Sequence, residues 1–124
     1  ATLTTEKVLQ GLAIPQDNKV LIEQRIYAIS YEQQYGKPEF LMELAKWESR
    51  FLKYPKILDS NNEYSMGLFH FQQGTFDQYC WHRYFIGNDI YDIDTQIKCV
   101  IKMDRDGLVP IHWVKSYTRI VTGK

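Results

Sequence analysis

One carboxylate occupies a position where a helical pattern calls for an apolar side chain. Within residues 38–52, one face of the predicted helix starts at Leu41 and continues three, four, seven and eleven residues later. All of these positions are apolar except the one seven residues after Leu41, which is Glu48. The apolar members of this face are Leu41, Leu44, Ala45 and Leu52. Burial and the negative end of the helix dipole both disfavour an ionised carboxylate, so we expect the pKa of Glu48 to be raised. A carboxyl group that stays protonated near neutral pH can act as a general acid.

The helix pattern by itself also allows Glu48 to reach solvent and pair with Arg50 or Lys53. The opposite stripe of the helix is charged, and pairs at i,i+3 and i,i+4 are expected along it. This stripe holds Glu39, Glu43, Lys46 and Arg50. Glu43 is therefore predicted to be a surface residue, in contrast to Glu48.

Polar residues follow this helix in a loop and a short run. The loop over 54–64 is predicted to be irregular. It contains Asp59 and Glu63, each of which is either a second carboxylate of a site or a solvated loop charge. The run SMGLFHFQQGTF then occupies 65–76. Apolar and polar residues alternate within 68–72, which is compatible with a short strand.

The order of these residues resembles that of the lysozyme-like lytic transglycosylase domain. The resemblance lies in a helix that ends in Glu-Ser, a loop, a Ser-x-Gly-Leu-Phe run and a following Thr. The matching residues are Glu48, Ser49, Ser65, Gly67, Leu68, Phe69 and Thr75. The resemblance implies a mainly α, lysozyme-like helical domain with a substrate cleft. It also implies a tight turn, rather than a strand, after Gly67.

The resemblance further implies an enzyme, without a cofactor, that cleaves the β-1,4 bond between N-acetylmuramic acid and N-acetylglucosamine in peptidoglycan. Glu48 would protonate the leaving oxygen and then act as a base on the sugar 6-hydroxyl, which gives a 1,6-anhydro product. The residues implied to contact the glycan strand are Ser65, Gly67, His70, Gln72 and Tyr117. His70 stands where the family usually has Gln, and Tyr117 would replace an aromatic motif that holds the catalytic carboxyl.

The sequence is also compatible with three other functions. A hydrolytic lysozyme (muramidase) of the same fold would use Asp59 or Glu63 to position a water. A non-catalytic glycan-binding module would keep the cleft without cleaving, and a helical interaction domain would contain Glu48 incidentally. For Ser65 and Gly67, turn chemistry is the alternative to a role in binding.

The composition is that of one domain over residues 1–124. A chain of 124 residues can bury one core but not two. Fifteen basic and fifteen acidic residues give zero net charge, which argues against a nucleic-acid partner. No apolar run reaches the length of a membrane span. We expect a monomer, in the extracellular, periplasmic or cell-wall location that the resemblance implies, although residues 1–10 show no signal-peptide pattern.

The two cysteines, Cys80 and Cys99, allow two interpretations. They can form a disulfide that stabilises the fold by roughly 3 kcal/mol in the chain-entropy model, or they can be two buried thiols. A zinc site made from both cysteines with His82 and His70 matches no common ligand spacing, so no metal site is predicted.

Helical periodicity and punctuation residues predict the elements that precede the Glu48 helix. A short helix is expected over 4–10, followed by a turn. A longer helix is expected over 18–35, with Gly36 just after its end. The inward residues of this helix are Ile22, Ile26 and Ile29.

The same reasoning predicts three helices after the Ser-x-Gly run. A capping box at 75–78 predicts a helix that ends before Gly87. The next helix is expected to begin after Asp92 or Asp94 and to end at Met103. Its inward residues are Ile93, Ile97, Val100 and Ile101. Pro110 opens the last helix. Its inward residues are Ile111, Val114, Tyr117 and Val121.

Overall fold

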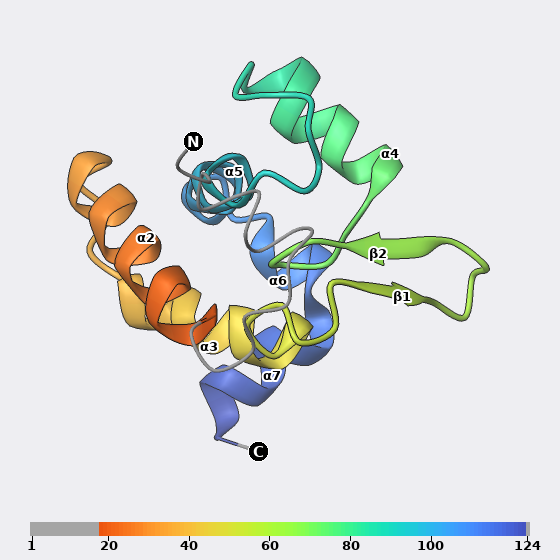
Figure 1. The fold of residues 1–124 in the computed structure, drawn as a ribbon, viewed down its shortest axis with the longest axis horizontal. Helices are drawn as coiled ribbons and strands as arrows, with labels where there is room; N and C mark the ends of the chain where they lie inside the picture. The colour runs from red at the N-terminus through yellow and green to blue at the C-terminus, as the bar shows by residue number, and fades with distance from the viewer. Residues whose placement is uncertain (1–17, 124) are drawn as a thin grey trace, which may run out of the picture.

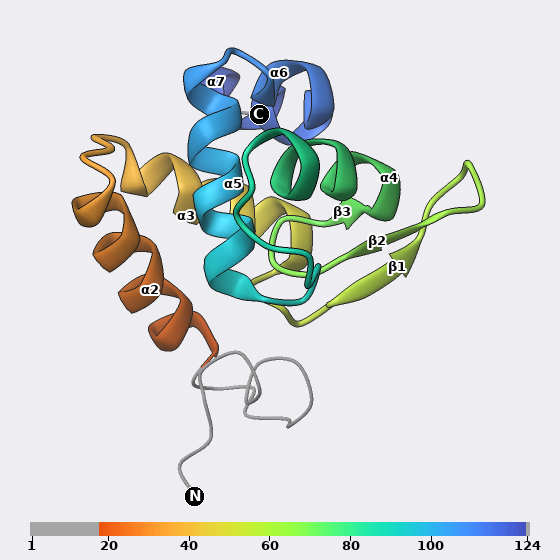
Figure 2. The same cartoon turned by 90° about the horizontal axis from the view of Figure 1, so that it is seen from above.

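Helix α5 (Ile93–Arg105) lies at the centre of the structure, a computed structural model that describes residues 18–123. In both views α2 (Asn18–Glu32) lies on one side of α5 and the strands lie on the other (Figures 1 and 2). The other helices are α3 (Pro38–Ser49), α4 (Gln73–Phe76), the π-helix η1 (Asp77–Arg83), α6 (Val109–His112) and α7 (Val114–Thr122). The strands are β1 (Lys56–Leu58), β2 (Tyr64–Met66) and β3 (Phe71–Gln72). The prediction of a mainly helical fold is confirmed, and the helix expected over 4–10 lies outside the described residues.

The core is built from apolar side chains of α2, α3 and α5, in agreement with the helical periodicity. The predicted inward residues of α2 and α5 are all buried. They are Ile22, Ile26, Ile29, Ile93, Ile97, Val100 and Ile101. None of the helices within residues 18–123 combines the length and the apolar character needed to cross a membrane.

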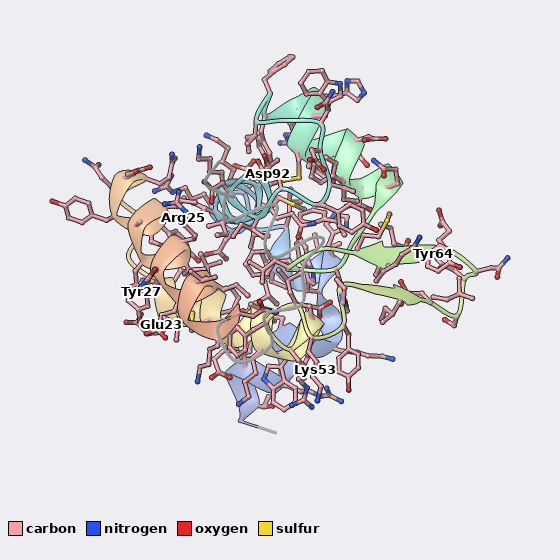
Figure 3. The ribbon with its side chains drawn as sticks, viewed as in Figure 1. Glu23, Arg25, Tyr27, Lys53, Tyr64 and Asp92 are labelled. Carbon is pink, nitrogen blue, oxygen red and sulfur yellow. A yellow bond between two sulfur atoms is a disulfide. The ribbon has the colours of Figure 1, made fainter. Side chains whose placement is uncertain are left out.

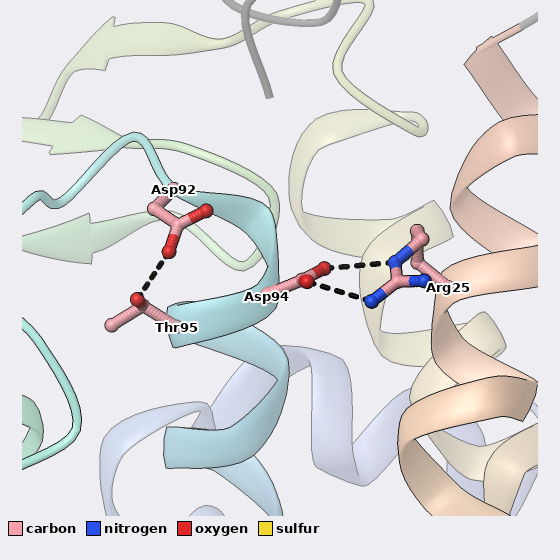
Figure 4. A network of polar contacts seen from close by, with 4 residues as sticks. All are labelled: Arg25, Asp92, Asp94 and Thr95. Carbon is pink, nitrogen blue, oxygen red and sulfur yellow. Dashed lines mark hydrogen bonds and ion pairs between the residues drawn. The ribbon is translucent and has the colours of Figure 1, made fainter. Parts of the chain in front are cut away.

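A two-point ion pair joins α2 to the first turn of α5 (Figure 4). Arg25 donates from Nε to Asp94 Oδ1 at 3.0 Å and from Nη2 to Asp94 Oδ2 at 2.7 Å. Such a bidentate pair fixes orientation as well as distance. Asp92 is the N-cap residue of α5 and accepts a hydrogen bond from Thr95 Oγ1, so the helix begins after Asp92 (Figure 4).

Helix α2 ends earlier than predicted, at Glu32. The residue with a left-handed backbone is Gln34, with φ 53°, and not Gly36. The N–H of Tyr35 donates to the carbonyl of Ser30 at 2.8 Å, which closes the end of the helix. The turn therefore forms two residues before the glycine that the sequence suggested.

Helix α3 ends at Ser49, as the Glu-Ser order of the resemblance implies, so Leu52 of the predicted apolar face is not part of the helix. The next three residues have left-handed backbones, with φ 54° at Arg50, 56° at Phe51 and 69° at Leu52. Leu52 nevertheless stays buried. The side chain of Ser49 supports this turn because its Oγ accepts a hydrogen bond from the Leu52 N–H at 2.9 Å.

The loop expected over 54–64 is instead an antiparallel hairpin, and this prediction was wrong. In the register of β1 and β2, Ile57 lies opposite Ser65. The polar residues form the tight turn between the strands, in which the N–H of Asn62 donates to the carbonyl of Asp59 at 2.9 Å. All three β1 side chains are exposed, so this strand has no apolar alternation that would reveal it in the sequence. Tyr64 of β2 points away from the helices (Figure 3).

The predicted turn after Gly67 is present at residues 67–70, and it is followed by the two-residue strand β3. The predicted capping box at 75–78 is not formed. Helix α4 begins at Gln73, its N-cap residue is Gln72, and no side chain caps it. Thr75 therefore lies inside the helix rather than at its start.

A disulfide joins Cys80 of η1 to Cys99 of α5, with a Cα–Cα distance of 5.3 Å (sulfur is yellow in Figure 3). The first of the two interpretations of the cysteines is thus the correct one. Because both sulfurs are bonded to each other, the alternative zinc site with His82 and His70 has no thiolate ligands.

The C-terminal segment is two helices rather than one. The backbone breaks at Trp113, with φ −124° and ψ 52°, and this break shifts the helical phase. As a result, three of the four predicted inward residues are exposed, by 64% at Ile111, 58% at Val114 and 58% at Val121. The buried residues of this segment are Val109, Trp113 and Ser116.

Candidate active site

A pocket of about 400 Å³ opens between the end of α3, the hairpin and the break between α6 and α7. Two carboxylates, Glu48 and Asp59, line it together. The other lining residues are Ser65, His70, Phe71, Gln72, Thr75, Ile111, His112, Trp113, Val114 and Lys115. Five of the predicted site residues therefore line one pocket: Glu48, Asp59, Ser65, His70 and Gln72.

Glu48 lies in the last turn of α3, next to Ser49, and its side chain is partly buried. Its pKa is raised from an ordinary value of 4.5 to about 7; burial is the largest cause of this rise, and the charge of Asp59 acts in the same direction. A hydrogen bond from Ser116 and the charge of Arg119 act in the opposite direction. The predicted rise in pKa is therefore found, and its main cause is the loss of solvent around the carboxylate. Near neutral pH this group can both donate and accept a proton.

Ser116 holds the carboxyl of Glu48 in place from α7. Its Oγ–H donates to Glu48 Oε2, and the residue is 4% exposed. Tyr117, which the sequence suggested for this region, does not line the pocket and packs edge-to-face against Phe40 at 6.2 Å between ring centroids. The resemblance therefore indicated the right place in the chain but the neighbouring residue, since Ser116 and not Tyr117 holds the carboxyl.

Ser49 anchors the end of α3 beneath the pocket. Its Oγ donates to the carbonyl oxygen of Leu68 at 2.7 Å while it accepts the Leu52 N–H. The residue is completely buried. The Glu-Ser pair thus has two separate tasks, since Glu48 faces the pocket and Ser49 ties its helix to the turn after β2.

Asp59 is oriented by two donors that lie opposite each other in the sheet. Ser65 of β2 and Gln72 of β3 are register partners, so their side chains lie on the same face. The Ser65 hydroxyl donates to Asp59 Oδ2, and Gln72 Nε2 donates to the same oxygen at 2.9 Å. These two donors fix the position of this oxygen in the pocket.

Glu63, the other candidate for a second carboxylate, does not line the pocket. It is exposed, and it accepts a hydrogen bond from Asn61 Nδ2 at 3.2 Å. Of the two candidates, the structure therefore brings Asp59 and not Glu63 to Glu48.

His70 lines the pocket as a neutral side chain. Its Nε2 lies 2.5 Å from the carbonyl oxygen of Tyr54, and because a carbonyl accepts only, this nitrogen carries the proton. Burial is the largest influence on His70 and lowers its pKa. His70 can therefore offer the ring nitrogen Nδ1 to a ligand as an acceptor.

Gly67 has a supporting role and does not line the pocket. Its φ is +84°, and a Cβ atom there would lie 2.1 Å from Nε2 of the buried Gln96. Gln96 accepts a hydrogen bond from the Phe69 N–H at 2.8 Å and donates to the carbonyl of Met66 at 3.0 Å. The glycine thus leaves room for Gln96, which holds the turn through these hydrogen bonds. The sequence pattern did not predict this role of Gln96.

The break between α6 and α7 contributes apolar side chains to the pocket wall, next to His112 and Lys115. Ile111 and Val114, which were predicted to be core residues, are exposed and line the pocket beside the ring of Trp113. Trp113 is fixed because its Nε1 donates to the carbonyl of Phe69 at 2.7 Å. The pocket thus combines carboxylates on one part of its surface with an apolar part that can contact the face of a sugar ring.

Comparisons of the chain with protein-family models, with curated proteins and with solved structures found no match. Within residues 18–123, no three side chains of the types that bind metals gather into a possible site. A function therefore has to be inferred from the chemistry of the pocket.

Proposed function

We propose that this protein is a lysozyme-like lytic transglycosylase that cleaves the β-1,4 bond between N-acetylmuramic acid and N-acetylglucosamine in peptidoglycan. One observation carries the proposal: a partly buried carboxyl, Glu48, has a pKa of about 7 and lines an open pocket of about 400 Å³. The order of Glu48-Ser49 and Ser65-x-Gly67, similar to that of lytic transglycosylases, supports the same conclusion.

The first half of the reaction needs a proton on the leaving oxygen while the muramyl ring gains oxocarbenium character. Glu48 supplies this proton, and the acetamido oxygen of the substrate forms a bond to C1 as the glycosidic bond breaks. In the second half, the Glu48 carboxylate removes the proton of the 6-hydroxyl, and O6 displaces the acetamido oxygen at C1. The product is a 1,6-anhydromuramyl end, and Glu48 is protonated again. Ser65, His70 and Gln72 line the same pocket and would contact the glycan strand.

Asp59 favours a second candidate function, hydrolysis by a lysozyme mechanism. Most glycosidases use two carboxylates that flank the scissile bond. Asp59 lines the pocket with Glu48 and is oriented by Ser65 and Gln72. In this alternative Asp59 would position a water that attacks C1.

Mass spectrometry of purified peptidoglycan digested in ¹⁸O-labelled water tests both functions. The proposal predicts new 1,6-anhydromuramyl ends without the label. Reducing ends that carry ¹⁸O would instead establish the hydrolase. Binding to peptidoglycan without new ends would indicate a glycan-binding module, and neither binding nor cleavage would leave a helical interaction domain.

The proposed substrate places the protein outside the cytoplasm, in the extracellular space, the periplasm or the cell wall. The disulfide between Cys80 and Cys99 supports this location, because disulfides persist mainly in oxidising compartments. We further propose that the protein acts as a monomer.

A further inference from the structure

Three basic side chains surround the indole ring of Trp47, the residue before Glu48. The distances to the ring centroid are 5.4 Å for Lys46 Nζ, 5.8 Å for Arg50 Cζ and 5.0 Å for Arg119 Cζ. Distances of this size are typical of cation–π contacts, which orient cations without neutralising them. We call Lys46, Arg50 and Arg119 around Trp47 the basic cluster.

No carboxylate within the described part of the chain forms an ion pair with the basic cluster. The ion pairs among residues 18–123 are Arg25–Asp94, Lys37–Asp104 and Arg83–Asp106. The charge pairs expected along the outer stripe of α3, such as that of Glu43 with Lys46, are not formed. The cluster is therefore a local excess of positive charge on a chain whose formal net charge is zero.

The basic cluster continues into the pocket along α7. Arg119 lies three residues after Ser116, and its charge lowers the pKa of Glu48, which shows that it lies close to the carboxyl. Lys115 lines the pocket and precedes Arg119 by four residues, so both lie on one face of α7. A track of positive charge thus leads from the pocket to Trp47.

We propose that the basic cluster binds the carboxylates of the stem peptide that peptidoglycan carries on N-acetylmuramic acid. The inference rests on the proposed function and adds the part of the substrate that the protein recognises beside the scissile bond. The positive charge extends to the pocket through Lys115. The stem peptide leaves the muramyl ring next to the bond that is cleaved, so a glycan strand bound in the pocket would bring its peptide carboxylates towards the cluster. Arginine side chains match carboxylates in geometry and charge.

Steady-state kinetics on two polymers test this inference. One consists of glycan strands with intact stem peptides, and the other of the same strands after amidase has removed the peptides; phosphate-containing wall polymers are removed from both. The double variant Lys46→Gln/Arg50→Gln removes two charges while leaving Arg119 beside Glu48. We expect its KM to rise about 3-fold to 10-fold on the stem-bearing strands, with kcat unchanged. On the stripped strands its KM should equal that of the wild type.

Two further variants serve as controls. Lys98→Gln/Lys102→Gln removes two charges from α5, outside the pocket lining, and should leave both KM values unchanged. Lys46→Arg/Arg50→Lys keeps both charges, so its KM on stem-bearing strands should lie closer to that of the wild type than the KM of Lys46→Gln/Arg50→Gln does. Raising the salt concentration should increase the wild-type KM on stem-bearing strands more than on stripped strands, because salt screens exposed charges.

Equal KM values for the wild type and Lys46→Gln/Arg50→Gln on stem-bearing strands would overturn the inference. An equal rise on both polymers would overturn it as well, since the cluster would then contact the sugar backbone. Co-sedimentation of the same proteins with both polymers separates this outcome from a failure of the proposed function. If neither polymer is cleaved but binding still requires both the stem peptide and the cluster, catalysis is wrong and recognition stands. If binding depends on neither, the inference is wrong.

Discussion

Glu48 is surrounded by groups that have opposite effects on its pKa. Burial raises the pKa of its carboxyl and is the largest effect, and the neighbouring charge of Asp59 acts in the same direction. Ser116 and Arg119 favour the ionised form. The result, a pKa of about 7, suits a group that first donates a proton and then removes one. Activity should therefore fall on the alkaline side of neutrality, where Glu48 loses its proton.

Replacement of Ser116 tests how this carboxyl is positioned. Ser116→Ala removes the donor to Glu48 Oε2. Since that hydrogen bond lowers the pKa of Glu48, its loss should move the alkaline fall of kcat/KM to higher pH. A misplaced carboxyl should also lower kcat by up to about 10²-fold.

Ser116→Thr keeps the hydroxyl and is the matched control for this experiment. It should retain the wild-type pH profile, whereas a purely structural role of Ser116 would leave the profile unchanged in the Ala variant as well. An unshifted alkaline limb in Ser116→Ala would therefore contradict the role given to this residue.

Glu48 was predictable from the sequence because a carboxylate in an apolar stripe is a local pattern. Ser65, His70 and Gln72 could be placed in the site from the order of the motif. Ser116 could not, because its contact with Glu48 depends on how α7 packs against α3. The order of residues in the sequence thus identified site residues that are near one another in the chain, but it did not identify Ser116, which only folding brings close to Glu48.

The end of α3 and the turn after β2 form one rigid unit beneath the pocket. Ser49 links the two through the carbonyl of Leu68. From the other side, Gln96 of α5 bonds the Phe69 N–H and the carbonyls of Met66 and Ile90. Buried side-chain amides that satisfy several backbone groups are costly to displace. This unit is what keeps Glu48 facing the hairpin.

Substitution of Gly67 should disrupt this unit. Gly67→Ala would force a left-handed backbone on a residue with a Cβ and drive that atom into the amide of Gln96. We expect a loss of about 2–4 kcal/mol in the free energy of unfolding, measured by urea denaturation. Gly107→Ala is the matched control, because its φ is also positive, at +74°, and no atom lies within 4 Å of its Cβ position. A Gly67→Ala protein as stable as the control would show that Gln96 moves aside at little cost.

The elements that the sequence did not reveal are those governed by tertiary contacts. Strand β1 is exposed throughout, so its sequence has no alternation of apolar and polar residues, and the sequence predicts a loop in place of the hairpin. The final helix was expected to continue from Pro110, but the backbone breaks at Trp113, a residue whose Nε1 donates to the carbonyl of Phe69. That break turned Ile111 and Val114 from predicted core residues into the apolar wall of the pocket. The long, strongly periodic helices α2 and α5, in contrast, were predictable.

The pocket is a property of the whole fold. Its lining comes from the end of α3, the hairpin, α4 and the α6–α7 segment, while α5 holds these parts from behind through Gln96. The disulfide between Cys80 and Cys99 adds a covalent link between η1 and α5. The sequence allowed either a disulfide or two thiols, because it does not show which helices are adjacent. A mainly helical domain could be predicted, but the arrangement of its parts could not.

The rate at which purified peptidoglycan acquires new chain ends, compared between Glu48→Gln and Glu43→Gln, tests the central claim most directly. Both variants exchange a carboxyl for an amide on α3, but Glu43 is exposed and outside the pocket. The amide at position 48 cannot deliver a proton, so kcat should fall by about 10²-fold to 10⁴-fold. Glu43→Gln should keep the wild-type rate. Full activity of a folded Glu48→Gln protein would contradict the assignment of Glu48 as the general acid.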